Sequence, residues 1–435
     1  MILLNFSREA RFKLRQMNYD TATRKILKDK MTIHYHTLSN GLPLVHVETA
    51  NQVAWCGLAI NAGSRDELEG HYGLAHFVEH TIFKGTRHRR AWHILNRMER
   101  VGGELNAYTT KEGTMLYSVF PEQHLGRAID LLADLVQWSV FPQEELDRER
   151  DVVLEEAASY RDTPSDAVYD DFEDLLFAGS ELGHNILGRK EDLERLTSDD
   201  CMRYLKTLYV PTNMAFFSVG PGRHERVFRL AEKAFGSMSH AMAPRHRVMP
   251  KSVEPFRKVI QIGTHQAHTI VGARVPDMHH PLRHALMLLN NILGGPGMNS
   301  LLNVELRERR GYVYSVESTL TLLSDCGWME IYLGCDPDDV KSSLRVIDRI
   351  TARLGQELLP ARRLDAYKKQ YCGQLVVAAD STEFMAMRAG RGLLYHGAVA
   401  SISDTIERIQ AVTPEEIAQA ATYLAHGAMS SLTFQ

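Results

Sequence analysis

The spacing of apolar residues predicts both helices and strands in this chain. Residues 122–140 carry apolar side chains every three or four positions, which is typical of an amphipathic helix, and residues 71–86 and 144–160 also show helical spacing. Residues 114–120 and 327–335 are short runs of apolar and β-branched side chains, which predict buried strands. We therefore expect an α+β fold with mainly antiparallel sheets, each carrying helices packed on one face.

The same arrangement of elements occurs twice along the chain. The strand-like segment that begins at Asn51 resembles the one that begins at Gln266, and each is followed by a loop and an apolar helix. The helix and strand that begin at Thr197 resemble those that begin at Thr413, where a threonine N-cap precedes an acidic first turn. The offset is 215 residues in the first comparison and 216 in the second. Two homologous domains are therefore expected.

The repeat and the local composition suggest where these domains lie. We expect one domain over residues 31–240 and the other over 255–435, joined by a proline-containing linker over 241–254. Residues 1–30 carry eight lysines or arginines against three acidic residues, and they are expected to form a basic N-terminal extension. Its acidic residues and low serine content argue against a mitochondrial presequence, and its short apolar start does not resemble a secretory signal.

Composition narrows the possible classes of function. Apolar residues make up 44% of the chain and charged residues 24%, as in globular proteins. There is no run of 18 or more apolar residues to suggest a membrane span, and a net charge of −4 without a basic patch argues against nucleic acid as a partner. The five cysteines form no CxxC pair, which favours a reducing compartment. We expect the cytoplasm, with the mitochondrial matrix as the alternative.

The strongest chemical signal is the run His76-Phe77-Val78-Glu79-His80 within the predicted helix 71–86. Residues four apart share a helix face, so His76 and His80 can direct both imidazoles at one point. Two neutral imidazoles and a carboxylate from elsewhere would make an open zinc site with a free position for water. The HxxEH order is that of the inverzincin metallopeptidases. The alternative is an amphipathic helix with two solvated histidines.

The predicted helix 144–160 is the candidate source of the missing carboxylate. Glu149 and Glu156 lie seven residues apart, which places both on one helix face, whereas Glu155 points about 100° away from Glu156. Surface glutamates are common on helices, so all three could equally be solvated charges. Spacing alone does not select the ligand.

Three motifs taken together resemble one known family. The segments HFVEH (from His76), GGELNAYTTKEGT (from Gly102) and ERDVVLEE (from Glu149) are similar to those of the pitrilysin superfamily, closest to its mitochondrial processing peptidase branch. The resemblance implies a zinc metalloendopeptidase that holds one Zn²⁺ per chain. It also implies that Glu156 is the third zinc ligand and that Glu149 supports the ligands from outside.

The chemistry of such a site assigns a role to the remaining motif residue. Zinc lowers the pKa of a bound water and polarises a carbonyl group. Glu79 is the candidate general base, which takes the proton of the attacking water and passes it to the leaving amine. The expected substrate is a peptide or an unfolded polypeptide.

A further part of the resemblance lies in the second repeat. Residues 304–318 are similar to a family signature in which the positions matching Arg307 and Tyr314 contact the substrate backbone. The resemblance implies that Tyr314 donates a hydrogen bond to the oxyanion and that Arg307 binds a peptide carbonyl. The alternative is an ordinary basic helix end and a strand tyrosine.

The segment after Gly103 is expected to form a strand near the metal. In relatives the matching strand is an exposed edge, which implies that Asn106, Ala107 and Tyr108 bind the substrate backbone by β-augmentation. The alternative is that these residues only begin a strand.

The second repeat is expected to be inactive. Aligning the two apolar helices places Leu286, Leu289 and Asn290 opposite the HxxEH residues, so this domain lacks the metal ligands. Family members twice as long enclose a chamber between four such units. We therefore expect a homodimer in which Arg307 and Tyr314 act in trans on the partner's zinc. A heterodimer, a peptidase dedicated to one precursor, a chaperone-like chamber and a non-catalytic scaffold subunit are the alternatives.

Overall fold

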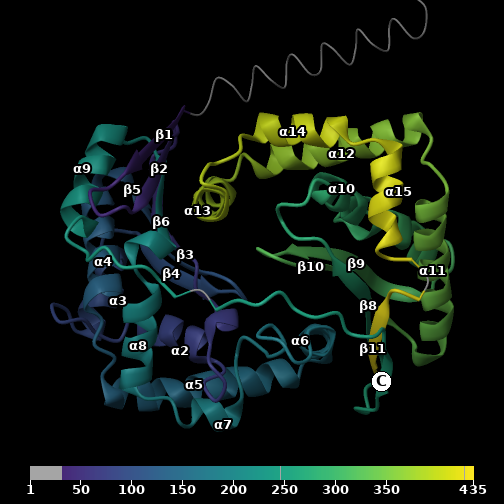
Figure 1. Cartoon of the computed structure of the whole chain (residues 1–435), viewed down its shortest axis with the longest axis horizontal. Coiled ribbons are helices and arrows are strands. Elements are labelled where there is room, and N and C mark those ends of the chain that lie inside the picture. The colour runs from purple at the N-terminus through teal and green to yellow at the C-terminus, as the bar shows by residue number, and fades with distance from the viewer. Residues whose placement is uncertain (1–31, 245, 426) are drawn as a thin grey trace, which may run out of the picture.

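Six strands between residues 32 and 220 form the first sheet (Figure 1). The computed structural model describes residues 32–244, 246–425 and 427–435, so the basic extension expected over 1–30 lies outside the described residues. The strands are β1 (Thr32–Thr37), β2 (Pro43–Glu48), β3 (Val53–Ile60), β4 (Glu104–Thr109), β5 (Thr114–Pro121) and β6 (Met214–Gly220). Their order is β1-β2-β6-β3-β5-β4, and every pair is antiparallel except β2 with β6.

A second sheet repeats this topology. Its strands are β7 (Arg257–Ile260), β8 (Ala267–Val275), β9 (Val313–Leu322), β10 (Gly327–Cys335) and β11 (Ser430–Phe434). Their order is β7-β11-β8-β10-β9, with β7 and β11 as the parallel pair. The order matches β2-β6-β3-β5-β4 position by position, with β1 as the extra strand. The expected pair of homologous, mainly antiparallel α+β units is therefore confirmed.

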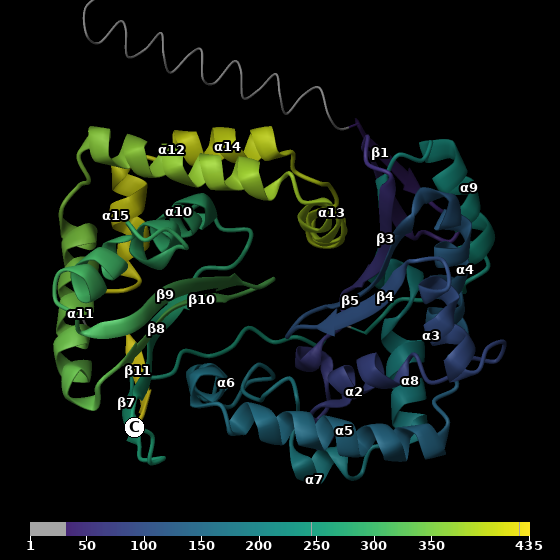
Figure 2. The ribbon, with the colours of Figure 1, turned by 180° about the vertical axis from the view of Figure 1, so that it is seen from behind.

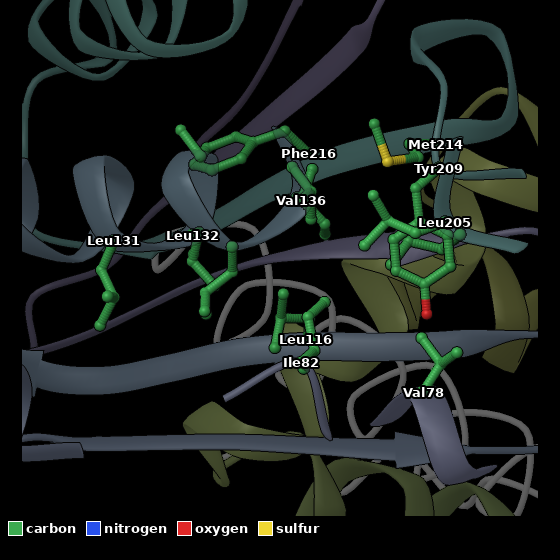
Figure 3. Close-up of a cluster of buried hydrophobic side chains, with 14 of the residues drawn as sticks. Val78, Ile82, Leu116, Leu131, Leu132, Val136, Leu205, Tyr209, Met214 and Phe216 are labelled. Atoms are coloured by element: carbon green, nitrogen blue, oxygen red, sulfur yellow. The ribbon is translucent and has the colours of Figure 1, made fainter. Parts of the chain in front are cut away.

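Helices of the first half of the chain cover one face of the first sheet, except for α6, which packs on the second sheet. The helices of this half are η1 (Ser64–Asp66), α2 (Leu74–Thr81), α3 (Ala91–Glu99), η2 (Glu122–His124), α4 (Leu125–Trp138), α5 (Gln143–Arg161), α6 (Pro164–Leu176), α7 (Lys190–Leu193), α8 (Ser198–Leu208), η3 (Pro211–Asn213) and α9 (His224–Phe235). Figure 3 shows how side chains from α2, α4 and α8 meet residues of β5 and β6 in the core. The apolar spacing that predicted a helix over 122–140 belongs to α4, whose apolar face lies in this core.

The second half of the chain has a corresponding set of helices, of which α13 packs on the first sheet. They are α10 (Arg283–Gly294), η4 (Asn303–Glu308), η5 (Pro337–Asp339), α11 (Val340–Gln356), α12 (Ala361–Ala378), α13 (Thr382–His396), α14 (Ile402–Ala411) and α15 (Pro414–Thr422). The two predicted threonine N-caps are both present. Thr197 accepts a hydrogen bond from the backbone of Asp200, and Thr413 accepts one from Glu416. Each pair forms a capping box, because the acidic side chain bonds back to the threonine nitrogen.

The other face of each sheet is covered by a helix from the opposite half of the chain (Figures 1 and 2). Phe172 of α6 packs in a buried cluster with Trp328 of the second sheet. Ala389 of α13 packs in a cluster with Phe217 of the first sheet. A Cβ atom at Gly390 would lie 2.7 Å from the Phe217 ring, so glycine there permits close approach. This exchange explains why β6 and β10 are buried along their whole lengths.

A buried ion network also joins the two halves. The guanidinium of Arg65, which is 1% exposed, donates to Glu112 at 2.6 Å and to both carboxylate oxygens of Asp325 at 2.6 and 2.7 Å. Ser324 donates its backbone N–H at 2.9 Å and its hydroxyl at 2.7 Å to Glu112. These bonds satisfy charges that would be costly to bury alone. In the described ranges, no helix is both long enough and apolar enough to span a membrane.

Candidate zinc centre

Helix α2 begins at a position that favours glycine. Gly73, which precedes the helix, has a φ of 96°, and a Cβ atom there would lie 2.9 Å from Cα of Gly188. The carboxylate of Glu67 accepts hydrogen bonds from the backbone nitrogens of Gly73 and Ala75 at 2.8 and 2.7 Å. His184 lies 3.0 Å from the same carboxylate. Glu67, which the sequence patterns did not indicate, therefore fixes where α2 starts.

Packing of the apolar face of α2 turns its histidines toward α5. Phe77 and Val78 are fully buried, and Figure 3 shows Val78 and Ile82 within the hydrophobic core. The imidazoles of His76 and His80 lie one turn apart with ring centroids 4.5 Å from each other. Figure 2 shows α2 alongside α5, the helix predicted to supply the third ligand. The predicted common face of the two histidines is therefore present.

The carboxylate of Glu156 meets both imidazoles. Its Oε2 lies 3.8 Å from Nε2 of His76 and 3.4 Å from Nε2 of His80. One ligand atom from each of these residues falls within 4.8 Å of the other two. Glu155 is exposed and lies outside this group, as its position on the helix predicts. Two imidazoles and one carboxylate form the donor set of an open zinc site, so these residues fit the metal.

The protonation of His76 also fits a metal ligand. Burial, with a smaller contribution from the neighbouring His80, lowers the pKa of His76 to about 3. The ring is therefore neutral near neutral pH, and a nitrogen lone pair is available without proton competition. Its Nδ1 is buried and has no hydrogen-bond partner among the described residues, which leaves this ring without other polar restraints.

Two charged residues hold His80 from the side away from Glu156. Nδ1 of His80 lies 3.1 Å from Oε1 of Glu149, and Nζ of Lys84 lies 2.5 Å from Oε2 of the same carboxylate. With Nδ1 protonated, His80 donates to Glu149 and turns the lone pair of Nε2 toward Glu156. Lys84 was not among the predicted site residues. Its position four residues after His80, within the helix predicted over 71–86, is the signal that could have indicated it, although α2 ends at Thr81.

Glu79 is half-buried between the predicted metal ligands and strand β4. Burial raises the pKa of its carboxyl, while Thr109 and His80 act in the opposite direction. A raised pKa makes this carboxylate a better proton acceptor than an exposed one. Because Glu79 lies outside the group of converging ligand atoms, it is free to act on a proton.

The predicted substrate strand is an edge of the first sheet. β4 carries Asn106, Ala107 and Tyr108, and among the described residues it pairs only with β5, which leaves one side of its backbone without a strand partner there. Asn106 is exposed, and Ala107 packs against the core. The ring of Tyr108 lies 5.6 Å from the guanidinium carbon of Arg391 on α13. The edge position agrees with the expected geometry, although Tyr108 faces a helix of the second half.

Arg307 and Tyr314 lie together but apart from the metal ligands. Both line a cavity of about 520 Å³ in the second half, beside the glycine-rich turn that contains Gly297. Tyr314 is on the edge strand β9 and is 61% exposed. In the described part of this chain, no hydrogen bond or ion pair links either residue to the three predicted zinc ligands. The structure therefore brings the metal ligands together and leaves this pair in a separate group.

Two sequence profiles match the chain in tandem. The profile described as Insulinase (Peptidase family M16) matches residues 44–190, and the profile described as Peptidase M16 inactive domain matches residues 195–371. The chain belongs to the M16 peptidase family. This family membership confirms the resemblance to the pitrilysin superfamily on which the ligand assignment depends.

Curated relatives of this M16 chain are named as proteases. It is 34% identical over 397 residues to an uncharacterized zinc protease of Streptomyces coelicolor, and the match covers 89% of this chain and 86% of the relative. It is 29% identical over 394 residues to the beta subunit of the mitochondrial-processing peptidase of Bos taurus, covering 88% of this chain and 80% of that subunit.

Solved structures share the fold of this M16 chain. A protease from Helicobacter pylori superposes with a TM-score of 0.85 at 23% identity, covering 93% of this chain and 100% of that one. A peptidase M16 inactive domain from Pseudomonas fluorescens superposes with a TM-score of 0.86 at 19% identity, covering 93% and 97%. At these identities the likeness concerns the fold.

The second half of this M16 chain has lost the ligand chemistry in its equivalent helix. Leu286 and Leu289 of α10 are fully buried in the second core. Asn290 accepts a hydrogen bond from the hydroxyl of Ser318 at 2.5 Å. None of these three side chains offers an imidazole or a carboxylate, and within the described residues the groups that could hold a metal lie in the first half.

Proposed function

We propose that this protein is a zinc-dependent endopeptidase that hydrolyses peptides or unfolded polypeptides. The observation that carries the proposal is the convergence of His76, His80 and Glu156 on one point, next to a glutamate outside the ligand set. The names of the relatives, which include zinc proteases, support the same activity. We also propose that residues 31–240 form the catalytic domain and residues 255–435 the inactive homologous domain, joined by residues 241–254.

The roles of the residues follow from their places around this centre. Bound to His76, His80 and Glu156, Zn²⁺ would supply a Lewis acid and lower the pKa of a coordinated water. Glu79 accepts a proton from the attacking water and then gives it to the leaving amine, so the leaving group departs as a neutral amine. Glu149 keeps His80 in the tautomer that offers Nε2 to the metal.

The free edge of β4 is the proposed seat for the substrate backbone. An extended peptide can add as a further strand, in which main-chain hydrogen bonds give affinity that does not depend on sequence. We propose that the backbones of Asn106 and Ala107 bond to the substrate, and the backbone of Tyr108 continues the same edge. The side chain of Tyr108 is engaged with α13, so its contribution is through the main chain.

Arg307 and Tyr314 are proposed to act on the zinc centre of a second copy of the chain. Both line a cavity in the second half of their own chain, and Tyr314 exposes its side chain on an edge strand. In a homodimer that encloses a chamber, the Tyr314 hydroxyl would donate to the oxyanion and the Arg307 guanidinium would bind a substrate carbonyl. Such a chamber would select peptides and unfolded segments by size. We propose that the protein is located in the cytoplasm.

A processing peptidase with a single precursor as its substrate is the second candidate. The similarity to the beta subunits of mitochondrial-processing peptidases at 29% and 30% identity favours it. A heterodimer would be the corresponding assembly. Profiling the products from a random peptide library separates the two candidates, because a general oligopeptidase cleaves many sequences and a dedicated enzyme cleaves few.

Metal dependence of peptide hydrolysis tests the proposed function directly. The chelator-treated full chain should lose hydrolysis of a quenched fluorescent peptide and recover it on addition of zinc. Glu156→Gln should not recover at the zinc concentration that restores the native chain, whereas the matched variant Glu155→Gln should. A folded, zinc-loaded protein that cuts no unfolded polypeptide would refute the proposal and favour a scaffold role.

Mixing two inactive variants tests action in trans. His80→Gln lacks a metal ligand, and Tyr314→Phe lacks the proposed oxyanion donor. If the sites are shared between subunits, a mixed dimer contains one site with an intact zinc centre and an intact tyrosine. Mass measurement should first verify that the subunits have exchanged. Recovered activity in the mixture then supports the shared site, and no recovery refutes it.

A further inference from the structure

A second group of histidine and carboxylate side chains lies at the other edge of the first sheet. His34 is on the edge strand β1, Glu48 ends β2, and His224 is the first residue of α9. One potential ligand atom from each residue lies within 4.8 Å of the other two, as in the proposed zinc centre. Figure 1 shows β1, β2 and α9 at the end of the first half, away from α2 and α5. The group is therefore separate from the catalytic centre.

The distances within this group resemble those in the catalytic centre. Nε2 of His34 lies 3.5 Å from Oε2 of Glu48, and Nδ1 of His224 lies 3.7 Å from Oε1. The corresponding nitrogen–oxygen distances in the catalytic centre are 3.4 and 3.8 Å. One carboxylate therefore faces two imidazoles in both places. All three residues are half-buried, so an ion can enter from solvent and yet be held mainly by protein atoms.

A second carboxylate orients His224 as Glu149 orients His80. Nδ1 of His224 faces Glu48, while its Nε2 lies 3.3 Å from Oε1 of Glu225. Metal-bound histidines usually donate their other ring N–H to a carboxylate, which fixes the tautomer and the ring direction. The proposed zinc centre has the same relationship, because His80 lies between its third ligand and Glu149.

The surroundings of the His34 ring also favour a bound cation. Its Nε2 is buried and makes no hydrogen bond within the described residues. The polar group that this nitrogen faces is the Glu48 carboxylate 3.5 Å away, and a cation between them would be bound by both groups. The rings of His34 and His224 stack with centroids 3.8 Å apart.

The packing of β1 against α9 holds these side chains in place. Glu48 lies two residues after His46, which pairs directly with His34 in the sheet, so Glu48 shares the face of His34. His36 lies on the same face and stacks on Phe228, one turn along α9 from the first residue of the helix. His36 stacks on a phenylalanine, which offers no metal ligand, so His36 is a matched control for the proposed site.

We propose that His34, Glu48 and His224 form a second binding site for a divalent first-row transition ion such as Zn²⁺. Imidazole and carboxylate are the ligands that such ions accept, and three protein ligands leave room for water. The bound ion ties the edge strand β1 to the start of α9. Its effect is therefore on the stability of this edge of the sheet, and the ion takes no part in peptide hydrolysis.

Counting bound metal in paired variants tests the second site. The full chain, stripped with a chelator and checked for fold by circular dichroism, is titrated with Zn²⁺ against a chromophoric chelator. The native chain should bind two ions, and both the double variant His76→Gln/His80→Gln and the double variant Glu48→Gln/His224→Gln should bind one. His36→Gln should still bind two. Cobalt absorption in the chain that lacks the catalytic histidines should report the second site alone.

Thermal unfolding provides a readout that does not depend on activity. In the chain with His76→Gln/His80→Gln, added zinc should raise Tm, because an ion bound only by the folded state stabilises it. Adding Glu48→Gln/His224→Gln should abolish that rise. The proposal is wrong if Glu48→Gln/His224→Gln binds as many ions as the native chain. A native chain that binds one ion, lost only in this variant, would instead refute the catalytic centre and leave the second site standing.

Discussion

The Nδ1 atom of His80 lies 3.1 Å from the carboxylate of Glu149, and that carboxylate also lies 2.5 Å from the ammonium of Lys84. Glu149 and Glu156 are two turns apart on α5, so one helix supplies both the carboxylate that faces Nε2 and the one that faces Nδ1. The ion pair with Lys84 keeps the Glu149 carboxylate in place. The position of the His80 ring is thus set by three charged side chains around it.

Replacing Glu149 should weaken metal binding more than catalysis. Glu149→Gln keeps the size of the side chain but removes the charge that orients His80, so zinc affinity should fall by about 10- to 100-fold. Peptide hydrolysis at saturating zinc should be largely retained. Competition with a chromophoric chelator measures the affinity. Glu155→Gln, on the exposed side of the same helix, should bind zinc like the native chain, and equal affinities in the two variants would contradict the role of Glu149.

Replacing Glu79 should separate metal binding from hydrolysis. Glu79→Gln removes the proposed proton acceptor and leaves the three ligand side chains unchanged. The expected result is a fall in kcat of about 10²- to 10⁴-fold, with zinc content equal to that of the native chain. Metal analysis and peptide kinetics on the same preparation check both parts. A variant that loses its zinc would show instead that Glu79 holds the site together.

Removing one hydroxyl from the second half should slow hydrolysis without affecting the metal. Tyr314→Phe deletes the proposed oxyanion donor, and the expected fall in kcat is about 10²-fold with little change in KM, because the bond forms mainly in the transition state. Tyr312→Phe is the matched control, since Tyr312 packs partly against the second core two residues away. A Tyr314→Phe enzyme with native kcat would exclude the hydroxyl from the reaction.

The buried network around Arg65 should account for much of the coupling between the halves. Arg65→Met leaves Glu112 and Asp325 without their main cationic partner, and breaking a buried ion pair in this way costs about 3–5 kcal/mol. Chemical denaturation of the full chain measures the loss. Arg148→Met is the control, because the Arg148–Glu145 pair is on the surface and should change stability by less than about 0.5 kcal/mol. Equal losses would contradict the network's role.

The candidate metal centre could be predicted because its two histidines lie close together in the sequence. His76 and His80 share a helix face by spacing alone, and the structure places them as predicted. The helical spacing left Glu149 and Glu156 equivalent, and only the family resemblance selected Glu156. The structure separates the two by the ring nitrogen that each faces. Lys84 is close to His80 in sequence, but an ammonium group is not a metal ligand, so ligand spacing alone does not indicate it.

Contacts between segments far apart in the sequence could not be predicted from the spacing of apolar residues. Apolar spacing can indicate that a helix buries one face, but it does not show which sheet α6 or α13 packs on. The structure shows each packing on the sheet of the opposite half. His34 and His224 are 190 residues apart and belong to no motif, so only the packing of α9 against β1 reveals their proximity.

Stability should fall as pH rises from about 4.5 to about 7, because Glu173 of α6 is half-buried near Glu330 of the second sheet. Burial raises the pKa of Glu173 above that of an ordinary glutamate, although Lys111, 3.7 Å away, opposes the shift. An acid with a raised folded pKa stabilises the fold when protonated, and this stability is lost as pH rises from the unfolded value through the folded one. Glu173→Gln should therefore be more stable than the native chain at pH 8 by about 1–2 kcal/mol, with a smaller difference at pH 5. In this variant the ammonium of Lys111 still donates to the carbonyl of His184 at 2.6 Å, so Lys111 retains a hydrogen-bond partner. Denaturant unfolding at both pH values measures the difference, and a variant less stable than the native chain at pH 8 would show that the Lys111 pair outweighs the cost of burial.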